Sequence, residues 1–332
     1  MKIAINGFGR IGRNVFKIAM EREGVDIVGI NDLTDAKTMA HLLKYDSTFG
    51  VYSREVTVGE DKIIVDGLQI PIFSIKNPAD LPWDELDVDV VIESTGIFRS
   101  ADAEGGGYLD HITAGARKVI LTVPAKDEIE TVVLGVNEEK IVSEINAYSN
   151  ASCTTNCLAP IVKVLNDSFG IEKGLMTTIH SYTNDQVLLD TPHSDLRRGR
   201  SAGLNIIPTS TGAALAIGKI IPALQGKLNG GAMRVPTPTG SLVDLTVQLI
   251  DDCTIEELNS AFKAAAAGSM EGILEYMEDP IVSMDVKGNP HSSIYDAGCT
   301  MKMGEGFFKI ISWYDNEMGY STRVIDLAQK LV

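Results

Sequence analysis

Two cysteines four residues apart, in the segment SNASCTTNCLAP at residues 149–160, could carry out covalent chemistry. Cys153 lies where small polar residues give way to an apolar run with helical spacing, which predicts a position in the first turn of a helix. Unpaired N–H groups and the helix dipole favour an anion there, so we expect a lowered pKa for this thiol. Cys157 is expected one helical turn further along, beside apolar residues.

Four roles compete for this pair: a disulfide, half of a metal site, inert packing, and a nucleophile. A disulfide between residues i and i+4 of one helix has poor geometry, and four cysteines in 332 residues are no disulfide framework. No CxxC motif or histidine pair at ligand spacing is present, so we predict no metal site. Inert burial fits Cys157, Cys253 and Cys299, whereas we favour a nucleophilic role for Cys153.

His180 is the candidate general base. It stands near the end of GLMTTIHSYTND, a strand-like segment that turns polar, where an imidazole can face a cleft. The other histidines (His41, His111, His193 and His291) have helical or loop contexts without a comparable setting. A lone histidine is more often structural than catalytic, so this hypothesis depends on Cys153.

A glycine-rich turn occurs in KIAINGFGRIGRNVF, where Gly7, Gly9 and Gly12 follow a strand-like run and open a helical one. Asp32 closes the next strand-like run, 20 positions beyond Gly12. This combination is typical of dinucleotide-binding folds, in which a helix N-terminus faces the pyrophosphate. The Asp32 carboxylate would accept hydrogen bonds from the adenosine ribose and repel a 2′-phosphate, which favours NAD over NADP. A glycine-rich turn without a ligand is the less favoured alternative.

Composition excludes several classes of protein. The net charge of −16 and the pI near 4.7 disfavour binding to nucleic acid or to an anionic membrane. The apolar runs are far shorter than the roughly 20 residues of a membrane helix, and no secretory leader is recognisable, so we expect a cytoplasmic protein. Anionic substrates would require a local basic cluster, and DLRRGR at residues 195–200 is the strongest one.

The order of apolar and helical segments predicts two domains. Up to residue 151, short apolar runs alternate with helical stretches, which predicts an α/β domain with a Rossmann-type doubly wound parallel sheet. Residues 152–317 mix long helical and extended segments, which indicates an α+β catalytic domain with a largely antiparallel sheet. The C-terminal helix, 318–332, is expected to pack back on the first domain.

Ten blocks resemble those of phosphorylating, NAD-dependent glyceraldehyde-3-phosphate dehydrogenases of bacterial type. They are INGFGRIGR, NDLTD, HLLKYDS, ESTGIF, PAKDE, SNASCTTNCLAP, HSYTNDQ, NIIPTSTGAA, MRVPTPTGS and SWYDNEMGYS, in the same order and over essentially the whole chain. The resemblance implies oxidative phosphorylation of D-glyceraldehyde 3-phosphate to 1,3-bisphosphoglycerate, through a thiohemiacetal and a thioester, in glycolysis or gluconeogenesis. It also implies a homotetramer whose partners are that substrate and inorganic phosphate.

The resemblance further implies the roles of individual residues. Cys153 matches the nucleophile and His180 the base. Residues at cofactor-binding positions are Gly7, Gly9, Arg10, Ile11, Gly12, Asp32, Lys76, Thr122, Asn316 and Tyr320. Residues at the site of the attacking phosphate are Ser152, Thr154, Thr211 and Gly212, and those at the site of the substrate's own phosphate are Thr183, Arg198 and Arg234. Arg197 adjoins Arg198, and sequence alone could confuse the two.

Three segments depart from the family pattern. One is LLDTPHSDL, which has Thr191 before Pro192 where many NAD-preferring bacterial members have Leu, and this slightly weakens the expected exclusivity for NAD. The segment SADAEGGGYLDHITAGARKV is longer than its usual counterpart, and we expect the insertion, at residues 101–113, to be a surface excursion with no effect on chemistry. The segment NPHSSIYDAG is similar to that of erythrose-4-phosphate dehydrogenases, which share the Cys/His pair and provide the alternative function. The intact STGAA and RRGR blocks favour the leading interpretation.

Overall fold

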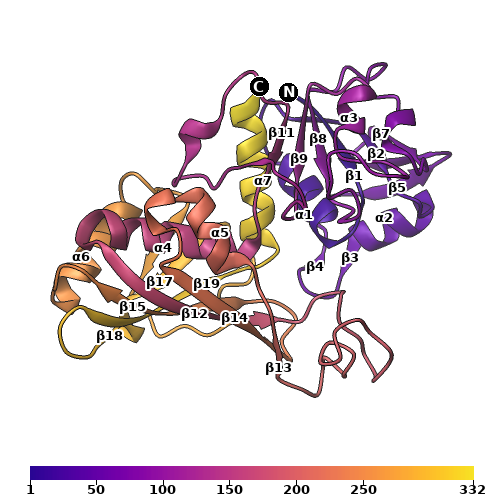
Figure 1. Cartoon of the computed structure of the whole chain (residues 1–332). Helices are drawn as coiled ribbons and strands as arrows, with labels where there is room; N and C mark the ends of the chain where they lie inside the picture. Colours follow the sequence, from indigo (N-terminus) through magenta and orange to yellow (C-terminus); the bar gives the residue numbers. More distant parts are fainter. The chain divides into compact units, whose positions relative to one another are not determined.

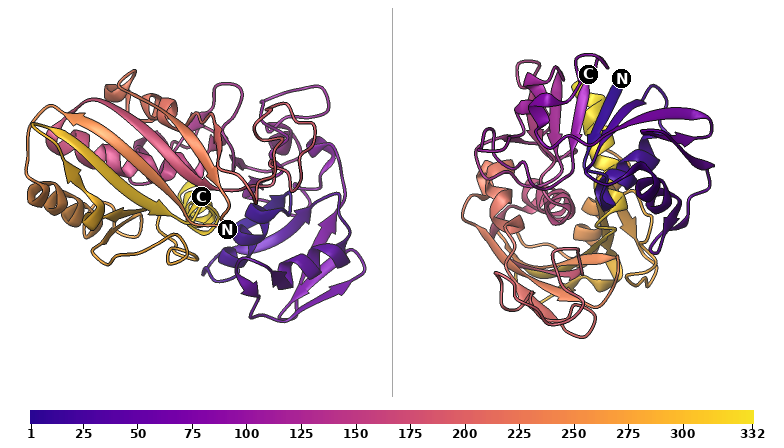
Figure 2. Two further views of the ribbon diagram at one scale, coloured as in Figure 1. Left: turned by 90° about the horizontal axis from the view of Figure 1, so that it is seen from below. Right: turned by 90° about the vertical axis from the view of Figure 1, so that its right-hand side faces the viewer.

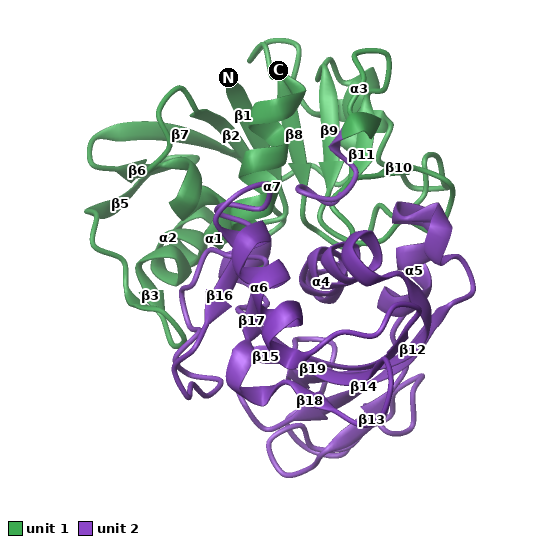
Figure 3. Ribbon diagram, turned by 90° about the vertical axis from the view of Figure 1, so that its left-hand side faces the viewer, with its two compact units in different colours: residues 1–132, 139–151, 321–332 green, residues 133–138, 152–320 purple.

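Short apolar segments of the N-terminal part pair into one nine-stranded sheet in the computed structural model, which describes residues 1–332 (Figure 1). Contacts divide the chain into two units, coloured separately in Figure 3. Unit 1 comprises Met1–Val132, Glu139–Ala151 and Ser321–Val332, and unit 2 comprises Val133–Glu138 and Ser152–Tyr320.

The elements of the N-terminal part alternate strands with helices. They are β1 (Lys2–Asn6), α1 (Arg10–Ala19), β2 (Asp26–Asn31), α2 (Ala36–Lys44), β3 (Tyr45–Asp46), β4 (Gly50–Val51), β5 (Val56–Gly59), β6 (Lys62–Val65), β7 (Leu68–Phe73), η1 (Pro78–Asp80), β8 (Val90–Glu93), α3 (Asp110–Thr113), β9 (Lys118–Leu121), β10 (Glu130–Thr131), η2 (Glu138–Lys140) and β11 (Ala147–Ser149).

The sheet of unit 1 has the order β10-β11-β9-β8-β1-β2-β7-β6-β5. Strands from β10 to β7 are paired in parallel, and β6 and β5 continue the sheet antiparallel. The chain leaves β1 for β2 on one side and later returns to β8 on the other, so the carboxyl end of β1 is a topological switch point. Because the central strands β1 and β8 are almost wholly buried, their apolar runs are continuous rather than alternating. This confirms the predicted Rossmann-type sheet.

The second half of the chain forms the other sheet and its helices. The elements are α4 (Cys153–Phe169), β12 (Ile171–Ser181), β13 (Ile207–Thr209), α5 (Ala213–Ile220), η3 (Pro222–Leu224), β14 (Leu228–Val235), β15 (Ser241–Leu249), α6 (Ile255–Ala266), β16 (Leu274–Met277), β17 (Ser293–Asp296), η4 (Ala297–Cys299), β18 (Met301–Lys302), β19 (Phe307–Tyr314) and α7 (Met318–Leu331).

The sheet of unit 2 has the order β13-β14-β12-β15-β19-β17-β16, with β18 paired to β19. Its long strands, coloured from pink through orange to yellow, lie side by side in the left view of Figure 2. Only the pairs β12–β14 and β16–β17 are parallel, which confirms a largely antiparallel sheet. Residues of β15 and β19 alternate between buried and half-buried, as expected where one face is covered. Helix α4 packs against β12, β15, β17 and β19, and α5 packs against β14.

Two further predictions concern single segments. The C-terminal residues Ser321–Val332 cluster with unit 1, and Val324, Leu327 and Ala328 are fully buried there. In the insertion at residues 101–113, residues 102–105, Leu109 and Thr113 are exposed, whereas Tyr108 and His111 are buried at 3% and 0% exposure. The segment is therefore not wholly a surface excursion, because its second half contributes Tyr108 and His111 to the interior. None of the helices is both long and apolar enough to cross a membrane.

Helix α6 begins with a reciprocal capping box. Thr254 Oγ1 accepts from the Glu257 backbone N–H at 3.1 Å, and the Glu257 carboxylate accepts from the Thr254 N–H at 2.8 Å. Thr254→Ala is expected to lower the free energy of unfolding by about 1 kcal/mol, because a helical N–H loses its partner. Urea denaturation would measure this, with Thr254→Ser, which keeps the hydroxyl, as the control. An unchanged unfolding midpoint in Thr254→Ala would show that the cap contributes nothing.

Candidate active site

Cys153 is the first residue of helix α4, as predicted. Ala151 has a φ of 54° and turns the chain just before the helix. Ser152 is the N-cap, and its hydroxyl accepts from the Thr155 backbone N–H at 3.1 Å. This serine preference at the N-cap explains why the polar SNAS segment ends where the helix begins. The capped first turn therefore fixes the position of the Cys153 side chain.

His180 lies beside this thiol, with its Nε2 atom 3.4 Å from Cys153 Sγ. The imidazole is 5% exposed and meets the Tyr314 ring edge-on, at 5.9 Å between ring centroids. The Tyr314 hydroxyl lies 2.9 Å from both Thr154 Oγ1 and Thr178 Oγ1. These contacts tie α4, β12 and β19 together behind the imidazole. The structure thus brings the predicted nucleophile and base into contact.

The other ring nitrogen of His180 faces a carbonyl and a cation. Nδ1 lies 2.7 Å from the Ser181 carbonyl oxygen and 2.5 Å from Arg234 Nη1, which itself donates to that carbonyl at 3.0 Å. Arg234 is the residue opposite His180 in the parallel register of β14 and β12. The Ser181 carbonyl can accept from Arg234 and also from the ring if the neutral imidazole carries its proton on Nδ1, and this tautomer leaves Nε2 as an acceptor facing the thiol. The close guanidinium then acts on Nδ1 as a repelling charge that disfavours a second proton on the ring.

Burial decides the charge state of the pair. It lowers the pKa of His180 to about 3, and the guanidinium of Arg234 adds to that effect. Burial also raises the pKa of the Cys153 thiol, which Arg234 and the hydrogen bonds of Thr154 oppose only in part. The expectation of a lowered thiol pKa was therefore wrong, because desolvation outweighs the helix N-terminus. The resting pair is a thiol and a neutral imidazole.

The residues predicted for the attacking phosphate lie at the starts of two helices that pack together. Ser152 caps α4, while Gly212 is the N-cap of α5 and Thr211 Oγ1 accepts from the Ala213 N–H at 3.2 Å. Helix N-termini of this kind present backbone N–H groups to anions. The side chain of Thr154 points elsewhere, since its hydroxyl is bonded to Tyr314 within the core.

The residues predicted for the substrate's phosphate are brought together only in part. Thr183 Oγ1 and Arg198 Nη1 both donate to the carboxylate of Asp185, the latter at 2.8 Å. Arg198 Nε also donates to Thr209 Oγ1 at 2.9 Å. Arg234 stands apart from this group, at His180. Sequence reasoning missed Asp185, although an acidic residue two positions after Thr183 was visible in HSYTND.

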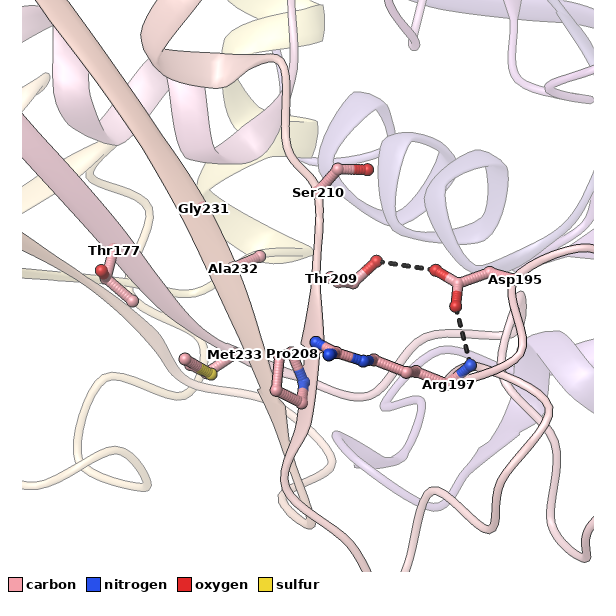
Figure 4. A pocket seen from close by; sticks show the side chains of 9 residues that line it. All are labelled: Thr177, Asp195, Arg197, Pro208, Thr209, Ser210, Gly231, Ala232 and Met233. Atoms are coloured by element: carbon pink, nitrogen blue, oxygen red, sulfur yellow. Dashed lines mark hydrogen bonds between the residues drawn. The ribbon is translucent and has the colours of Figure 1, made fainter.

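Arg197 and Arg198 have different surroundings. Arg197 lines a cavity of about 420 Å³ together with Thr177, Asp195, Thr209 and neighbouring residues of β14 (Figure 4). Successive side chains of a strand point to opposite faces, so Thr177 and this cavity lie on the sheet face opposite Thr178 and His180. The structure therefore separates Arg197 from the Cys/His pair.

A second cavity, of about 300 Å³, lies in unit 1 at the switch point beside β1. Four predicted cofactor residues line it: Gly7, Gly9, Asp32 and Lys76. Sequence reasoning missed the other lining residues, which are Asn6, Asn31, Leu33, Ile75, Ser94, Thr95, Ile97 and Phe98. Most of them end or follow strands β1, β2, β7 and β8, so the rule that ligands bind at the carboxyl ends of parallel strands could have found them.

The glycine-rich turn fits a closely approaching ligand. A Cβ atom on Gly7, whose φ is +93°, would lie 2.6 Å from the Thr95 backbone nitrogen, and one on Gly12 would lie 2.1 Å from the Gly7 carbonyl oxygen. Nothing lies within 4 Å of the corresponding position on Gly9, the N-cap of α1. Asp32 Oδ2 accepts from the Phe8 backbone N–H at 2.7 Å and so holds the turn. These features leave room for a pyrophosphate at the helix N-terminus.

The remaining predicted cofactor residues do not line this cavity. Arg10, in the first turn of α1 with Ile11, forms an ion pair with Asp46 at 2.9 Å, and Thr122 donates to the Glu93 carbonyl at 3.1 Å. Asn316 and Tyr320 belong to unit 2 and are buried. The side-chain oxygen of Asn316 accepts from the Ser181 and Ser241 hydroxyls, at 2.7 and 3.0 Å, which leaves its amide N–H groups as the available donors.

All four cysteines are free thiols. Cys157 and Cys253 are buried, as expected of inert cysteines, and burial raises the pKa of Cys157 to about 12. Cys299 is exposed, so the interpretation of this residue as a buried cysteine was wrong. No group of three or more His, Cys, Asp or Glu side chains is arranged to hold a metal ion.

Comparison with known proteins places both units in one family. Residues 1–101 match the model of the glyceraldehyde 3-phosphate dehydrogenase NAD-binding domain, and residues 152–316 match that of the C-terminal domain. A glyceraldehyde-3-phosphate dehydrogenase from Borreliella burgdorferi is 68% identical over 100% of both chains. Glyceraldehyde-3-phosphate dehydrogenase 1 of Bacillus cereus is 56% identical over 98% of this chain and 97% of its own. These matches favour the leading interpretation over an erythrose-4-phosphate dehydrogenase.

The charge of Arg234 favours the thiolate form of Cys153, and its removal should raise the thiol pKa further. The rate of Cys153 alkylation by iodoacetamide increases with pH as the thiol ionises and then reaches a plateau. In Arg234→Ala this increase is expected at higher pH than in the wild type, so at any pH below the plateau the variant should react more slowly. Arg197→Ala removes an equal charge on the other sheet face and is the control. An unshifted profile in Arg234→Ala would contradict the assigned electrostatic role.

Proposed function

The chain belongs to the glyceraldehyde-3-phosphate dehydrogenase family, and on that premise we propose that it oxidises D-glyceraldehyde 3-phosphate to 1,3-bisphosphoglycerate with NAD and inorganic phosphate. The observation that carries the proposal is the 3.4 Å contact between Cys153 Sγ and His180 Nε2 at the start of α4. The glycine-rich cavity with Asp32 supports NAD as the hydride acceptor. The reaction is a step of glycolysis or gluconeogenesis.

Cys153 begins the reaction by forming a bond to the aldehyde carbon. As sulfur attacks, its proton passes to His180 Nε2, and the carbonyl electron pair moves to oxygen. Nε2–H then donates to this oxyanion, which takes the proton to give a thiohemiacetal. Because the imidazole is neutral at rest, with a pKa of about 3, it accepts the proton only as negative charge develops beside it. A well-placed general base of this kind contributes about 10²–10⁴-fold to the rate.

Oxidation converts the thiohemiacetal into a thioester. NAD, when bound, accepts the hydride from the thiohemiacetal carbon. His180 Nε2 takes the hydroxyl proton at the same time, which leaves a C=O group joined to sulfur. Inorganic phosphate then attacks this carbon and the bond to sulfur breaks. The leaving sulfur takes the proton from His180 Nε2, which restores the Cys153 thiol and the neutral imidazole, and the acyl phosphate is released. Ser152, Thr154, Thr211 and Gly212 are proposed to hold the attacking phosphate. The positions of Ser152, Thr211 and Gly212 at the starts of α4 and α5 support this, whereas Thr154 is proposed to contribute only its backbone N–H, because its hydroxyl is bonded to Tyr314.

Substrate and cofactor require positive charge in a chain whose net charge is −16. Arg198 and Arg234, with Thr183, are proposed to bind the substrate's phosphate, since guanidinium groups match phosphate geometry. Residues proposed to bind NAD are Gly7, Gly9, Arg10, Ile11, Gly12, Asp32, Lys76, Thr122, Asn316 and Tyr320. The free amide N–H groups of Asn316 suit the carboxamide oxygen of nicotinamide.

We further propose a cytoplasmic homotetramer with an NAD-binding domain at 1–151, joined by the C-terminal helix, and a catalytic domain at 152–317. Exposed apolar side chains between Ser181 and Ile207 support the assembly. Leu188, Leu189 and Leu204 are 88%, 76% and 81% exposed. Several large apolar side chains exposed within one segment of the chain favour an interaction surface there.

Reduction of NAD by D-glyceraldehyde 3-phosphate is expected to require inorganic phosphate for sustained turnover, with NADH absorbance as the measurement. Cys153→Ser should lower kcat by at least about a thousandfold, because the hydroxyl is a far poorer nucleophile. NAD binding should be nearly unchanged. Cys299→Ser, at the exposed cysteine, is the matched control and should keep full activity. Sustained phosphate-independent turnover, or Cys153→Ser activity close to that of the wild type, would refute the proposed mechanism.

Asp32 is expected to set the cofactor preference. Asp32→Asn removes the negative charge, and its side-chain oxygen can still accept from Phe8 N–H, which keeps that contact of the glycine-rich turn, while its NH₂ group replaces the oxygen that accepts from Thr34 N–H. The ratio of kcat/KM for NADP to that for NAD should rise by about tenfold or more, as repulsion of the 2′-phosphate is relieved. Asp35→Asn, at the exposed N-cap of α2, is a control with the same charge change. An unchanged ratio in Asp32→Asn would show that Asp32 does not discriminate between the cofactors.

A further inference from the structure

A chain of three buried side chains lies behind the cavity of unit 1. Trp83, His111 and Glu93 are 0%, 0% and 1% exposed. Trp83 Nε1 lies 3.0 Å from His111 Nδ1, and His111 Nε2 lies 3.0 Å from Glu93 Oε2. None of these residues belongs to the reaction described above, and His111 comes from the segment that was expected to be a surface excursion.

The chemistry of tryptophan sets the direction of this chain. An indole N–H can only donate, so His111 Nδ1 is the acceptor and carries no proton. The imidazole is then neutral with its proton on Nε2, which it donates to the Glu93 carboxylate. A histidine held in this way is a directed hydrogen-bond donor rather than a cation.

Glu93 therefore accepts hydrogen bonds from neutral donors only. Oε2 accepts from His111 and from Asn6 Nδ2, the latter at 2.5 Å, while Oε1 accepts from the Thr95 backbone N–H at 2.8 Å and from the Thr95 hydroxyl. No lysine or arginine forms an ion pair with this carboxylate. A buried carboxylate is stable only where such donors satisfy its oxygens, so the four contacts are held as a set.

The partners of Glu93 form part of the cavity wall. Asn6 and Thr95 line the cavity directly. The Asn6 side-chain oxygen accepts from Asn31 Nδ2 at 2.7 Å, and Asn31 in turn exchanges two hydrogen bonds with the backbone of Ile75, both at 2.9 Å. Asn31 and Ile75 line the cavity as well. One carboxylate thus orients groups contributed by the ends of β1 and β2 and by the residues after β7 and β8.

We propose that Glu93, oriented by His111 and Trp83, is a positioning residue that preorganises this cavity for the adenosine half of the dinucleotide. The assignment rests on the proposed function, in which Asp32 on the same cavity wall takes the adenosine ribose. Glu93 acts through Asn6 and Thr95 and not on the reacting atoms. It therefore contributes to cofactor affinity, since a wall already in its bound arrangement loses less entropy on binding.

Glu93→Gln is the decisive variant, because it keeps the size of the side chain and places one NH₂ group where a carboxylate oxygen stood. In either amide orientation that NH₂ faces donors, namely His111 and Asn6 or the two donors of Thr95. His111 cannot accept from it at Nε2, because the indole N–H of Trp83 occupies the other nitrogen. The mismatch must therefore reach the cavity wall.

The dissociation constants of NAD, ADP-ribose and nicotinamide mononucleotide would be measured by calorimetry, and kcat at saturating NAD by NADH absorbance. In Glu93→Gln, NAD and ADP-ribose are both expected to bind about tenfold more weakly, while nicotinamide mononucleotide binding and kcat stay within about twofold of wild type. Tyr148→Phe is the control: it removes a buried hydroxyl that bonds the backbone of Val142, away from the cavity. It should leave all four quantities unchanged despite a lower melting temperature.

Unchanged ADP-ribose affinity in Glu93→Gln, or a loss of kcat with affinity kept, would overturn the proposal. If Glu93→Gln does not fold, Trp83→Phe tests the proposal instead. It keeps Glu93 but removes the indole N–H that fixes the proton of His111 on Nε2. A weakening of ADP-ribose by about threefold or more then supports the proposal, and a smaller effect overturns it. Failure of wild-type protein to bind NAD would instead refute the proposed function, so the two failures are distinct.

Discussion

The contact between a thiol and an imidazole in surroundings that disfavour charge is the constraint on which the site depends. Burial raises the pKa of Cys153 and lowers that of His180, so a neutral pair is favoured over two separated charges. At 3.4 Å between Sγ and Nε2, a proton can pass between them when a substrate carbonyl accepts the electrons of sulfur. This arrangement suits the proposed reaction, in which the thiol gives its proton to the imidazole as sulfur attacks an electrophile.

Such a contact needs a scaffold that holds both partners. His180 is the last residue but one of β12. Its pair in the parallel neighbour β14 is Arg234, and the preceding residue, Ile179, pairs with Leu242 of the antiparallel neighbour β15. Cys153 stands at the capped start of α4, which packs across the same sheet. The Tyr314 hydroxyl, bonded to Thr154 and Thr178, joins helix and strand at this point. A helix start and a strand end are both rigid, so the geometry does not depend on a loop.

Features set by interactions between residues close together in the chain could be predicted from the sequence, whereas features set by contacts between distant residues could not. The glycine-rich turn, Asp32 and the capped start of α4 are set by neighbours in the chain, and spacing identified them. The direction of the Cys153 pKa shift depends on how much protein surrounds the thiol, which spacing does not contain. Asp185, and the separation of Arg197 from His180, depend on which face of a strand each residue meets. They became visible only once the sheet was known.

Glu93 shows the same rule within unit 1. Glu93 contacts Asn6, which lies 87 residues earlier in the chain, and His111, which lies 18 residues later. His111 in turn contacts Trp83, which lies 28 residues before it. No sequence periodicity connects these positions, and His111 lies in the insertion that was expected to be a surface excursion with no effect on chemistry. The sheet brings them together because β1 and β8 are neighbours at the switch point, where a ligand cavity forms. Where a parallel sheet opens a cavity, polar groups at the strand ends lose the partners that a neighbouring strand would provide. The buried Glu93 carboxylate accepts hydrogen bonds from several of these groups, and in the proposal above it thereby fixes the shape of the cavity wall.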